Sequence, residues 1–291
     1  MKKAKIGSFI YHVADMRPKF ELLCEMGLDS FQLQSWSPSL RTDESAEKLV
    51  ELSKEYNIEI SNLWCGWTYS PMIASGNYND MFNTWGLVPP DFRSERLKDL
   101  MQGADWAKKV GIKHVATHMG FIPENPNDPL YASFLTTVKI LLTTIKANGQ
   151  SLNFETGQET PMTMLRTFED IGDEEHLGVN LDTANLILYG KGNPVDALKV
   201  FGKYVKGLHC KDGLFPTTGR KLGEEVPLGE GEANIAKVVE MLHGLKYKGH
   251  FTIEREISGE KQRIDIIKAR DLLRELTSQY DWDFGDEDEA K

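Results

Sequence analysis

Four polar residues at regular intervals are the strongest candidates for chemistry in this sequence. Glu155 follows Phe154, and Asp182, His209 and Glu254 each also follow an apolar residue within a β-rich segment. Because residues alternate between the two faces of a strand, each polar side chain faces away from its apolar neighbour. Spacings of 27, 27 and 45 residues separate the four in turn. The pattern predicts that successive βα units bring them to one place.

Three converging carboxylates repel one another unless a positive charge lies between them. A divalent cation meets this need, and three oxygen ligands with one nitrogen suit Mn²⁺, Co²⁺, Mg²⁺ or Zn²⁺. We therefore expect Glu155, Asp182, His209 and Glu254 to share one divalent cation. The alternative is that each is a separately hydrogen-bonded polar group of the interior.

The elements that must position these residues alternate regularly along the chain. Strands are predicted near residues 5–10, 30–36, 58–64, 114–121, 151–156, 177–183, 205–211 and 250–256. Helical periodicity follows each of them, at 17–26, 43–56, 93–110, 130–147, 161–171, 194–204, 234–246 and 262–279. Eight βα units predict a single (β/α)8 TIM barrel over residues 1–280, with an acidic tail at 281–291. An open doubly wound sheet is the alternative, but no Gly-x-Gly-x-x-Gly turn follows the first strand.

Composition narrows the classes of function. The 291 residues include 34 Lys and Arg against 44 Asp and Glu, a net charge of −10, so the chain lacks the positive field of a non-specific nucleic-acid binder. No apolar run approaches the ~20 residues that cross a membrane. Three cysteines without paired spacing are typical of a reducing cytoplasm. We expect a cytoplasmic protein with a small-molecule partner, which can form a homo-oligomer.

Further residues are candidates for contacting a substrate. His118 lies on the inward face of the fourth predicted strand, and Lys211 lies one step beyond His209 on the same face. Glu230 lies between two glycines in a long loop, where substrate loops often occur. Trp64 ends the third predicted strand, and aromatic rings bind the faces of sugars. Each of these residues has an ordinary structural role as its alternative.

Several segments resemble the sugar phosphate isomerase/epimerase family. They are NFETGQETP (153–161), LDTANL (181–186), LHCKDG (208–213), VPLGEGEANI (226–235) and FTIEREISGE (251–260). That family has the xylose isomerase-like barrel and includes ketose 3-epimerases and inosose dehydratases. The likeness is close over 150–260 and weaker over 1–149. It implies a metal held by Glu155, Asp182, His209 and Glu254, with the two glutamates also transferring protons.

Two positions depart from the ketose 3-epimerase pattern. Asn185 stands where those enzymes often place a histidine, three residues after the metal-binding aspartate, and we expect it to contact substrate. Lys211 stands near the position of their arginine. The resemblance thus implies a metal-dependent isomerase or epimerase of a sugar, keto-sugar or related polyol that works through an enediolate. A dehydratase or lyase of a keto-sugar or inosose is the runner-up. Endonuclease IV-like DNA repair and non-catalytic sugar binding are the remaining alternatives.

Overall fold

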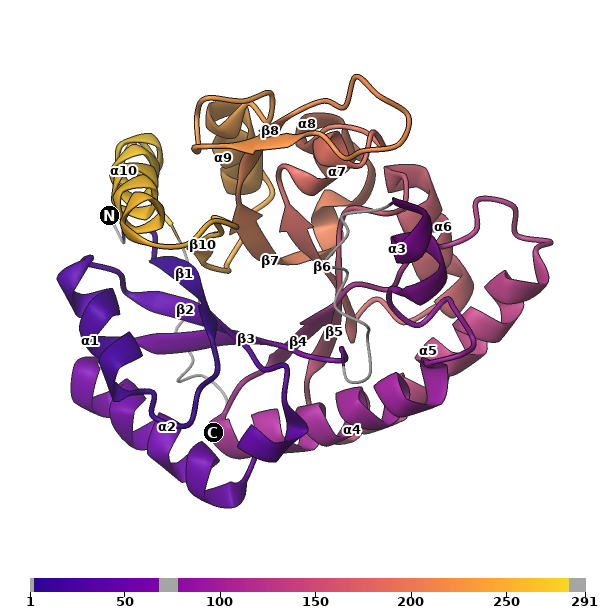
Figure 1. Ribbon diagram of the computed structural model, residues 1–291, viewed down its shortest axis with the longest axis horizontal. Coiled ribbons are helices and arrows are strands. Elements are labelled where there is room, and N and C mark those ends of the chain that lie inside the picture. The colour runs from indigo at the N-terminus through magenta and orange to yellow at the C-terminus, as the bar shows by residue number, and fades with distance from the viewer. Residues whose placement is uncertain (1–2, 68–77, 283–291) are drawn as a thin grey trace.

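Eight parallel strands close into a barrel (Figure 1). The computed structural model describes residues 3–67 and 78–282. The barrel order is β1-β2-β3-β4-β5-β6-β7-β10, with β10 pairing back onto β1. The strands are β1 (Ile6–Tyr11), β2 (Ser30–Gln34), β3 (Glu59–Trp64), β4 (His114–Thr117), β5 (Ser151–Glu155), β6 (Leu177–Asp182), β7 (Val205–Cys210) and β10 (Phe251–Ile253). The predicted (β/α)8 barrel is confirmed.

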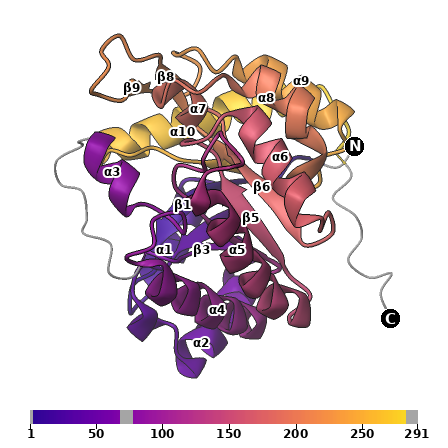
Figure 2. The same cartoon turned by 90° about the vertical axis from the view of Figure 1, so that its right-hand side faces the viewer.

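Eight helices surround the barrel and cover the outward faces of its strands (Figures 1 and 2). They are α1 (Arg17–Glu25), α2 (Asp43–Tyr56), α4 (Arg93–Val110), α5 (Pro129–Ala147), α6 (Pro161–Ile171), α8 (Pro194–Phe201), α9 (Ile235–Gly244) and α10 (Glu260–Thr277). Helix α2 shows how apolar residues at helical spacing predict the buried face of a helix. Its Ala46, Leu49 and Leu52 are buried, and the Thr42 side chain caps its start by accepting a hydrogen bond from the Ser45 N–H.

Several short elements were not predicted. They are α3 (Tyr78–Thr84), α7 (Asn185–Leu188), the 3₁₀ turns η1 (Pro38–Leu40) and η2 (Gly202–Tyr204), and the antiparallel hairpin of β8 (Asp212–Leu214) and β9 (Glu224–Val226). Helix α3 and the hairpin lie at the same end of the barrel (Figure 2). Helix α7 begins three residues after Asp182, whose Oδ1 accepts hydrogen bonds from the N–H groups of Ala184 and Asn185 at 2.8 Å. Four residues are too few to show a helical period.

Helix α5 is, among the described helices, the one long and apolar enough to pass as a membrane span by length and composition. Its apolar face packs on the barrel instead. Phe134 contacts Phe154 of β5 edge-on, with ring centroids 6.3 Å apart, and Leu141 and Ile145 are fully buried. The helix is therefore part of the outer layer of the barrel.

The C-terminal part of the described chain belongs to the core. Trp282 is only 2% exposed, its ring lies 5.0 Å from that of Phe251, and its Nε1 donates to the Thr277 carbonyl at 2.9 Å. Trp282 is thus folded against the barrel, although it was counted in the acidic tail at 281–291. Residues 283–291 lie outside the described residues, so the rest of that tail stays a prediction.

Candidate metal centre

The four predicted ligands lie together at the C-terminal end of the barrel. Glu155 and Asp182 end β5 and β6, His209 is the penultimate residue of β7, and Glu254 directly follows β10. Each offers one ligand atom, and these atoms all lie within 4.8 Å of one another. The 27-residue spacing predicted this meeting because one βα unit moves the chain to the neighbouring strand.

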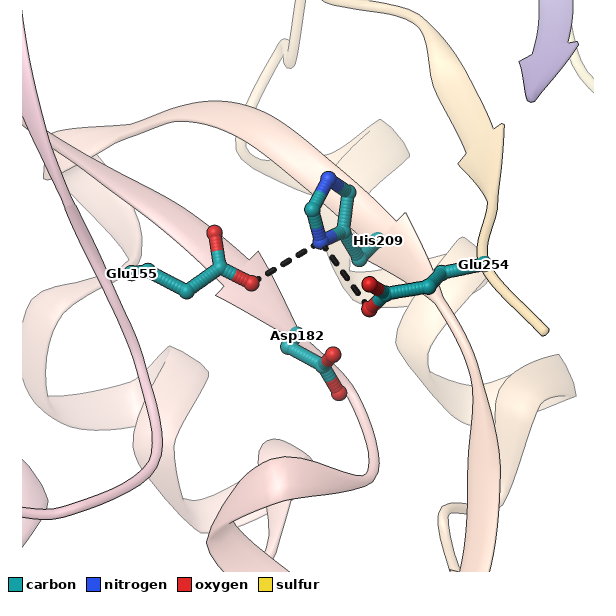
Figure 3. Close-up of side chains that lie close together, drawn as sticks. All are labelled: Glu155, Asp182, His209 and Glu254. Atoms are coloured by element: carbon teal, nitrogen blue, oxygen red, sulfur yellow. Dashed lines mark ion pairs between the residues drawn. The ribbon is translucent and has the colours of Figure 1, made fainter. Parts of the chain in front are cut away.

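Glu155 and Glu254 approach His209 from opposite sides (Figure 3). The Nδ1 atom of His209 lies 2.8 Å from Oε1 of Glu155 and 3.2 Å from Oε2 of Glu254. Asp182 completes the group from β6 and is fully buried. Two carboxylates therefore face each other across one imidazole nitrogen.

The donor atoms of this group fit a divalent cation. Oδ2 of Asp182 and Nδ1 of His209 are buried, and neither has a hydrogen-bond partner of normal geometry among the residues described. Buried polar atoms are rarely left without a partner. Both atoms point into the same cluster, where Glu155 and Glu254 add two carboxylate oxygens. A hard or borderline cation accepts such a set of oxygen and nitrogen atoms.

The pKa shifts within the cluster also favour a bound cation. Burial alone would lower the pKa of His209, but the carboxylates of Glu155 and Glu254 raise it well above its usual value. Burial raises the pKa of Asp182 well above its usual value, and repulsion from Glu254 and Glu155 adds to that shift. Without a cation the cluster therefore holds protons. Because metal ligands must lose their protons, metal binding at this site should release them.

An inner layer of amide side chains supports the cluster, and the sequence analysis missed it. Gln32 Oε1 accepts a hydrogen bond from Asn62 Nδ2 at 3.3 Å. His209 Nε2 lies 2.9 Å from the same oxygen, and because an amide oxygen can only accept, His209 Nε2 is the donor of this second hydrogen bond. Gln32 Nε2 donates to Asn180 Oδ1 at 3.0 Å, and Asn180 Nδ2 donates to Glu155 Oε2. Because Gln32 keeps a proton on Nε2, Nδ1 is the nitrogen of His209 that would bind a cation once it has released its own proton.

Strand alternation offered a signal for this inner amide layer. Asn180 lies two residues before Asp182 on the same face of β6, one step deeper in the barrel. Its partner across the register on β7 is Gly207. A Cβ atom at Gly207 would lie 2.0 Å from Asn180 Oδ1, so only glycine leaves room for the amide.

Lys211 and Asn185 meet beside the ligands, and their contact with a substrate stays a prediction. Lys211 is buried, and its Nζ lies 3.4 Å from Glu254 Oε2, 3.6 Å from Asp182 Oδ2 and 3.2 Å from Glu256 Oε1. Its Nζ also donates to Asn185 Oδ1 at 3.3 Å. Burial would lower the pKa of Lys211, but the surrounding carboxylates raise it well above its usual value. The ammonium is therefore a fixed positive charge at the edge of the cluster.

An aromatic wall, formed by Trp36, Trp64, Trp67 and Trp85, lies next to His118. The Trp64 ring stacks on Trp67 with centroids 5.4 Å apart and meets His118 edge-on at 5.6 Å. The Trp85 ring lies 5.5 Å from His118. Burial lowers the pKa of His118 to about 4, so its imidazole is neutral at pH 7. The substrate contacts of Trp64 and His118 stay predictions.

The loop that carries Glu230 is more firmly held than its glycines suggested. Buried Asp212 accepts hydrogen bonds from the N–H groups of Gly213, Gly229 and Ala233 at 2.9–3.0 Å. Glu230 itself is exposed, and its N–H donates to the Pro227 carbonyl at 3.0 Å. The structure places Glu230 on the outside of this loop, apart from the four clustered ligands, and its contact with substrate stays a prediction.

The family of the chain follows from comparison with known proteins. A family model described as xylose isomerase-like TIM barrel matches residues 20–276. The chain belongs to the xylose isomerase-like TIM barrel family. A solved structure of a xylose isomerase domain protein from Planctomyces limnophilus is 31% identical, covers 96% of this chain and 99% of its own, and superposes with a TM-score of 0.88. The family resemblance predicted from the sequence is confirmed.

Other proteins resemble this chain at lower identity or over a shorter part of it. A Mycobacterium smegmatis barrel solved in complex with magnesium is 18% identical over 96% of this chain and 99% of its own, with a TM-score of 0.71. The "Putative L-ribulose-5-phosphate 3-epimerase SgbU" of Escherichia coli is 35% identical over 92 residues, 31% of this chain and 32% of that protein. A "Probable endonuclease 4" of Sulfurihydrogenibium is 21% identical over 92% of this chain and 99% of that protein.

Proposed function

We propose that this protein is a divalent-metal-dependent isomerase or epimerase of a sugar, keto-sugar or related polyol. The observation that carries the proposal is the approach of Glu155 and Glu254 to one centre from opposite sides. Two carboxylates placed in this way can act on opposite faces of a substrate that binds between them. The epimerase named among the relatives and the magnesium bound in a related barrel support the same proposal.

Glu155, Asp182, His209 and Glu254 would hold the cation. When bound there, a divalent cation supplies Lewis acidity to a substrate carbonyl and hydroxyl and makes the carbon-bound proton between them more acidic. One glutamate removes that proton to give an enediolate, and the other returns a proton. Return to the opposite face of the same carbon gives an epimer, and return to the neighbouring carbon gives an isomer.

Residues around the ligands would bind and orient the substrate. The Lys211 ammonium, fixed by three carboxylates, can donate to a substrate oxygen in which negative charge develops. Asn185 shares a hydrogen bond with Lys211 and can contact the same part of the substrate. His118 is neutral, so one ring nitrogen can donate and the other accept. The Trp64 ring offers an apolar surface for the face of a sugar.

A dehydratase or lyase is the second candidate. Lys211 Nζ lies 3.4 Å from Glu254 Oε2, so an ammonium that can donate a hydrogen bond to a leaving hydroxyl stands next to a base. Loss of that hydroxyl after the same proton abstraction would give elimination. Endonuclease-like chemistry is disfavoured by the net charge of −10, and simple sugar binding would not depend on a metal. The free thiols of Cys24, Cys65 and Cys210 support a cytoplasmic location.

A substrate screen with matched variants tests the proposal. Keto-sugars, sugar phosphates and inososes would be incubated with the protein and Mn²⁺ or Co²⁺, and the products identified. In Glu155→Gln and Glu254→Gln turnover should fall by ~10²-fold or more, because each change removes a base with little change in shape. Glu47→Gln, an exposed change on α2, serves as the control and should keep normal turnover. Near-normal turnover in both site variants would refute the acid–base assignment.

A further inference from the structure

A cavity lies at the N-terminal end of the barrel, opposite the ligand cluster. Its volume is about 870 Å³, within the usual range of small-molecule sites. Its lining comes from the places where strands begin: Lys5 precedes β1, Glu59 opens β3, Lys113 precedes β4, and Lys206 is the second residue of β7. The ligand cluster of Glu155, by contrast, lies where the strands end.

Positive charge is concentrated in this cavity. Seven lysines line it, whereas Glu59 is the single acid among the lining residues that the structure describes. Two of the lysines already form ion pairs, Lys5 with Glu59 and Lys203 with Glu174. Lys54, Lys246 and Lys248 are exposed to solvent around the opening. Such a concentration is notable in a chain with a net charge of −10, and it creates a local field that attracts anions.

The floor of the cavity is polar and contains an unsatisfied acceptor. Asn62 lines the cavity and is 2% exposed, and its Nδ2 donates to Gln32 Oε1 at 3.3 Å. Its Oδ1 has no hydrogen-bond partner within residues 3–67 and 78–282. Because a buried acceptor left unpaired costs free energy, this oxygen favours a ligand that brings a donor such as a hydroxyl group. Gln32 and Ser61 add further polar lining.

We propose that this cavity, here called the lysine cavity, binds a small phosphorylated metabolite that also carries hydroxyl groups. Lysine ammonium groups bind phosphate as point charges and need no planar geometry. The ring of lysines would hold the phosphoryl group near the opening, and a hydroxyl group would donate to Asn62 at the floor. The two features favour different groups of one ligand, because the lysines supply only donors and Asn62 Oδ1 supplies only an acceptor.

The lysine cavity is separate from the metal centre but connected to it. Asn62 donates to Gln32, and Gln32 in turn contacts His209. The inner amide layer therefore runs from the floor of one site to a ligand of the other. The binding proposed here does not depend on the reaction proposed above, so the two can fail independently.

Glucose 6-phosphate, glucose and inorganic phosphate are suitable probes. Hydrogen–deuterium exchange would be followed at the amides of residues 110–114 and 245–250, which border the lysine cavity. Glucose 6-phosphate should slow exchange there, more strongly than inorganic phosphate, and glucose should have no effect. Slower exchange only around residues 154–158 and 182–186 would place the probe at the metal centre and overturn the proposal. No change in exchange with any probe would also overturn it.

Two triple variants with equal loss of charge separate specific binding from general electrostatics. Lys54→Gln, Lys246→Gln and Lys248→Gln together remove three charges from the lysine cavity. Lys98→Gln, Lys139→Gln and Lys268→Gln remove three exposed charges elsewhere. The first should weaken binding of glucose 6-phosphate by roughly tenfold or more, and the second by less than roughly twofold. Equal weakening in both would show that only net charge matters, and would refute the site.

Discussion

Removal of the metal should destabilise the protein, because metal binding to the folded state adds to the free energy of unfolding. Carboxylate oxygens that lie within 4.8 Å of one another repel by roughly 3.5 kcal/mol or more at an effective dielectric constant of about 20. The protein without metal relieves this repulsion by keeping protons, as the raised pKa of Asp182 indicates. A cation at a hundredfold excess over its Kd adds about 2.7 kcal/mol to the free energy of unfolding.

For a chain of 291 residues, that free energy corresponds to a change in Tm of roughly 4–5 °C. Exhaustive chelation should lower the Tm by this amount and abolish turnover, and Mn²⁺ or Co²⁺ should restore both. Calorimetry with and without chelator, together with elemental analysis, provides the measurement. Asp182→Asn should lose the metal-dependent difference, whereas Glu230→Gln, an exposed change, should keep it. An unchanged Tm in the unmodified protein and no bound metal would refute the reasoning.

Three further predictions test the surroundings of the centre. Gln32→Leu removes the acceptor for His209 Nε2, so metal affinity measured by calorimetric titration should fall by ~10–100-fold, and unchanged affinity would contradict its positioning role. Lys211→Met leaves buried carboxylates unpaired, so unfolding in urea should show a loss of ~3–5 kcal/mol without metal and a smaller loss with Mn²⁺. Equal losses in both conditions would count against this electrostatic account. Burial, with Arg41 adding to it, lowers the pKa of His12 from 6.5 to about 4. The unfolded chain therefore binds a proton first as pH falls, so this stability is present above pH 6.5 and is lost towards pH 4. The loss between pH 7 and pH 5 is about 2 kcal/mol, and His12→Gln should remove that part of the pH dependence of Tm.

The ligand cluster was predictable because each ligand lies in a short strand pattern, and this pattern recurs from one βα unit to the next. Alternation along a strand shows which face Glu155 and Asp182 occupy, and the 27-residue period shows that their strands are neighbours. The next barrel strand, β10, pairs directly with β7 and brings Glu254 beside the first three ligands. The same argument extended two residues deeper would have found Asn180, because it depends on the same alternation.

Other features depend on distances across the barrel that no local pattern encodes. Gln32 contacts His209 across 177 residues of sequence, and this contact requires the actual radius of the barrel. The burial of Lys211 among three carboxylates depends on where Glu256 lies after β10 has ended. The concentration of lysines at the N-terminal end also arises only on folding, because its members come from segments between Lys5 and Lys248.

Incorporation of solvent deuterium tests the central proposal, that Glu155 and Glu254 transfer protons to and from carbon. A carboxylic acid exchanges its proton with water, so a substrate turned over in D₂O should yield product with deuterium at the reacting carbon. Mass spectrometry and NMR of the product would measure the amount and position of the label. Direct hydride transfer moves the hydrogen between carbons without such exchange. Product free of deuterium, formed with retention of a label placed at the reacting carbon, would contradict the proposal and leave both glutamates as metal ligands alone.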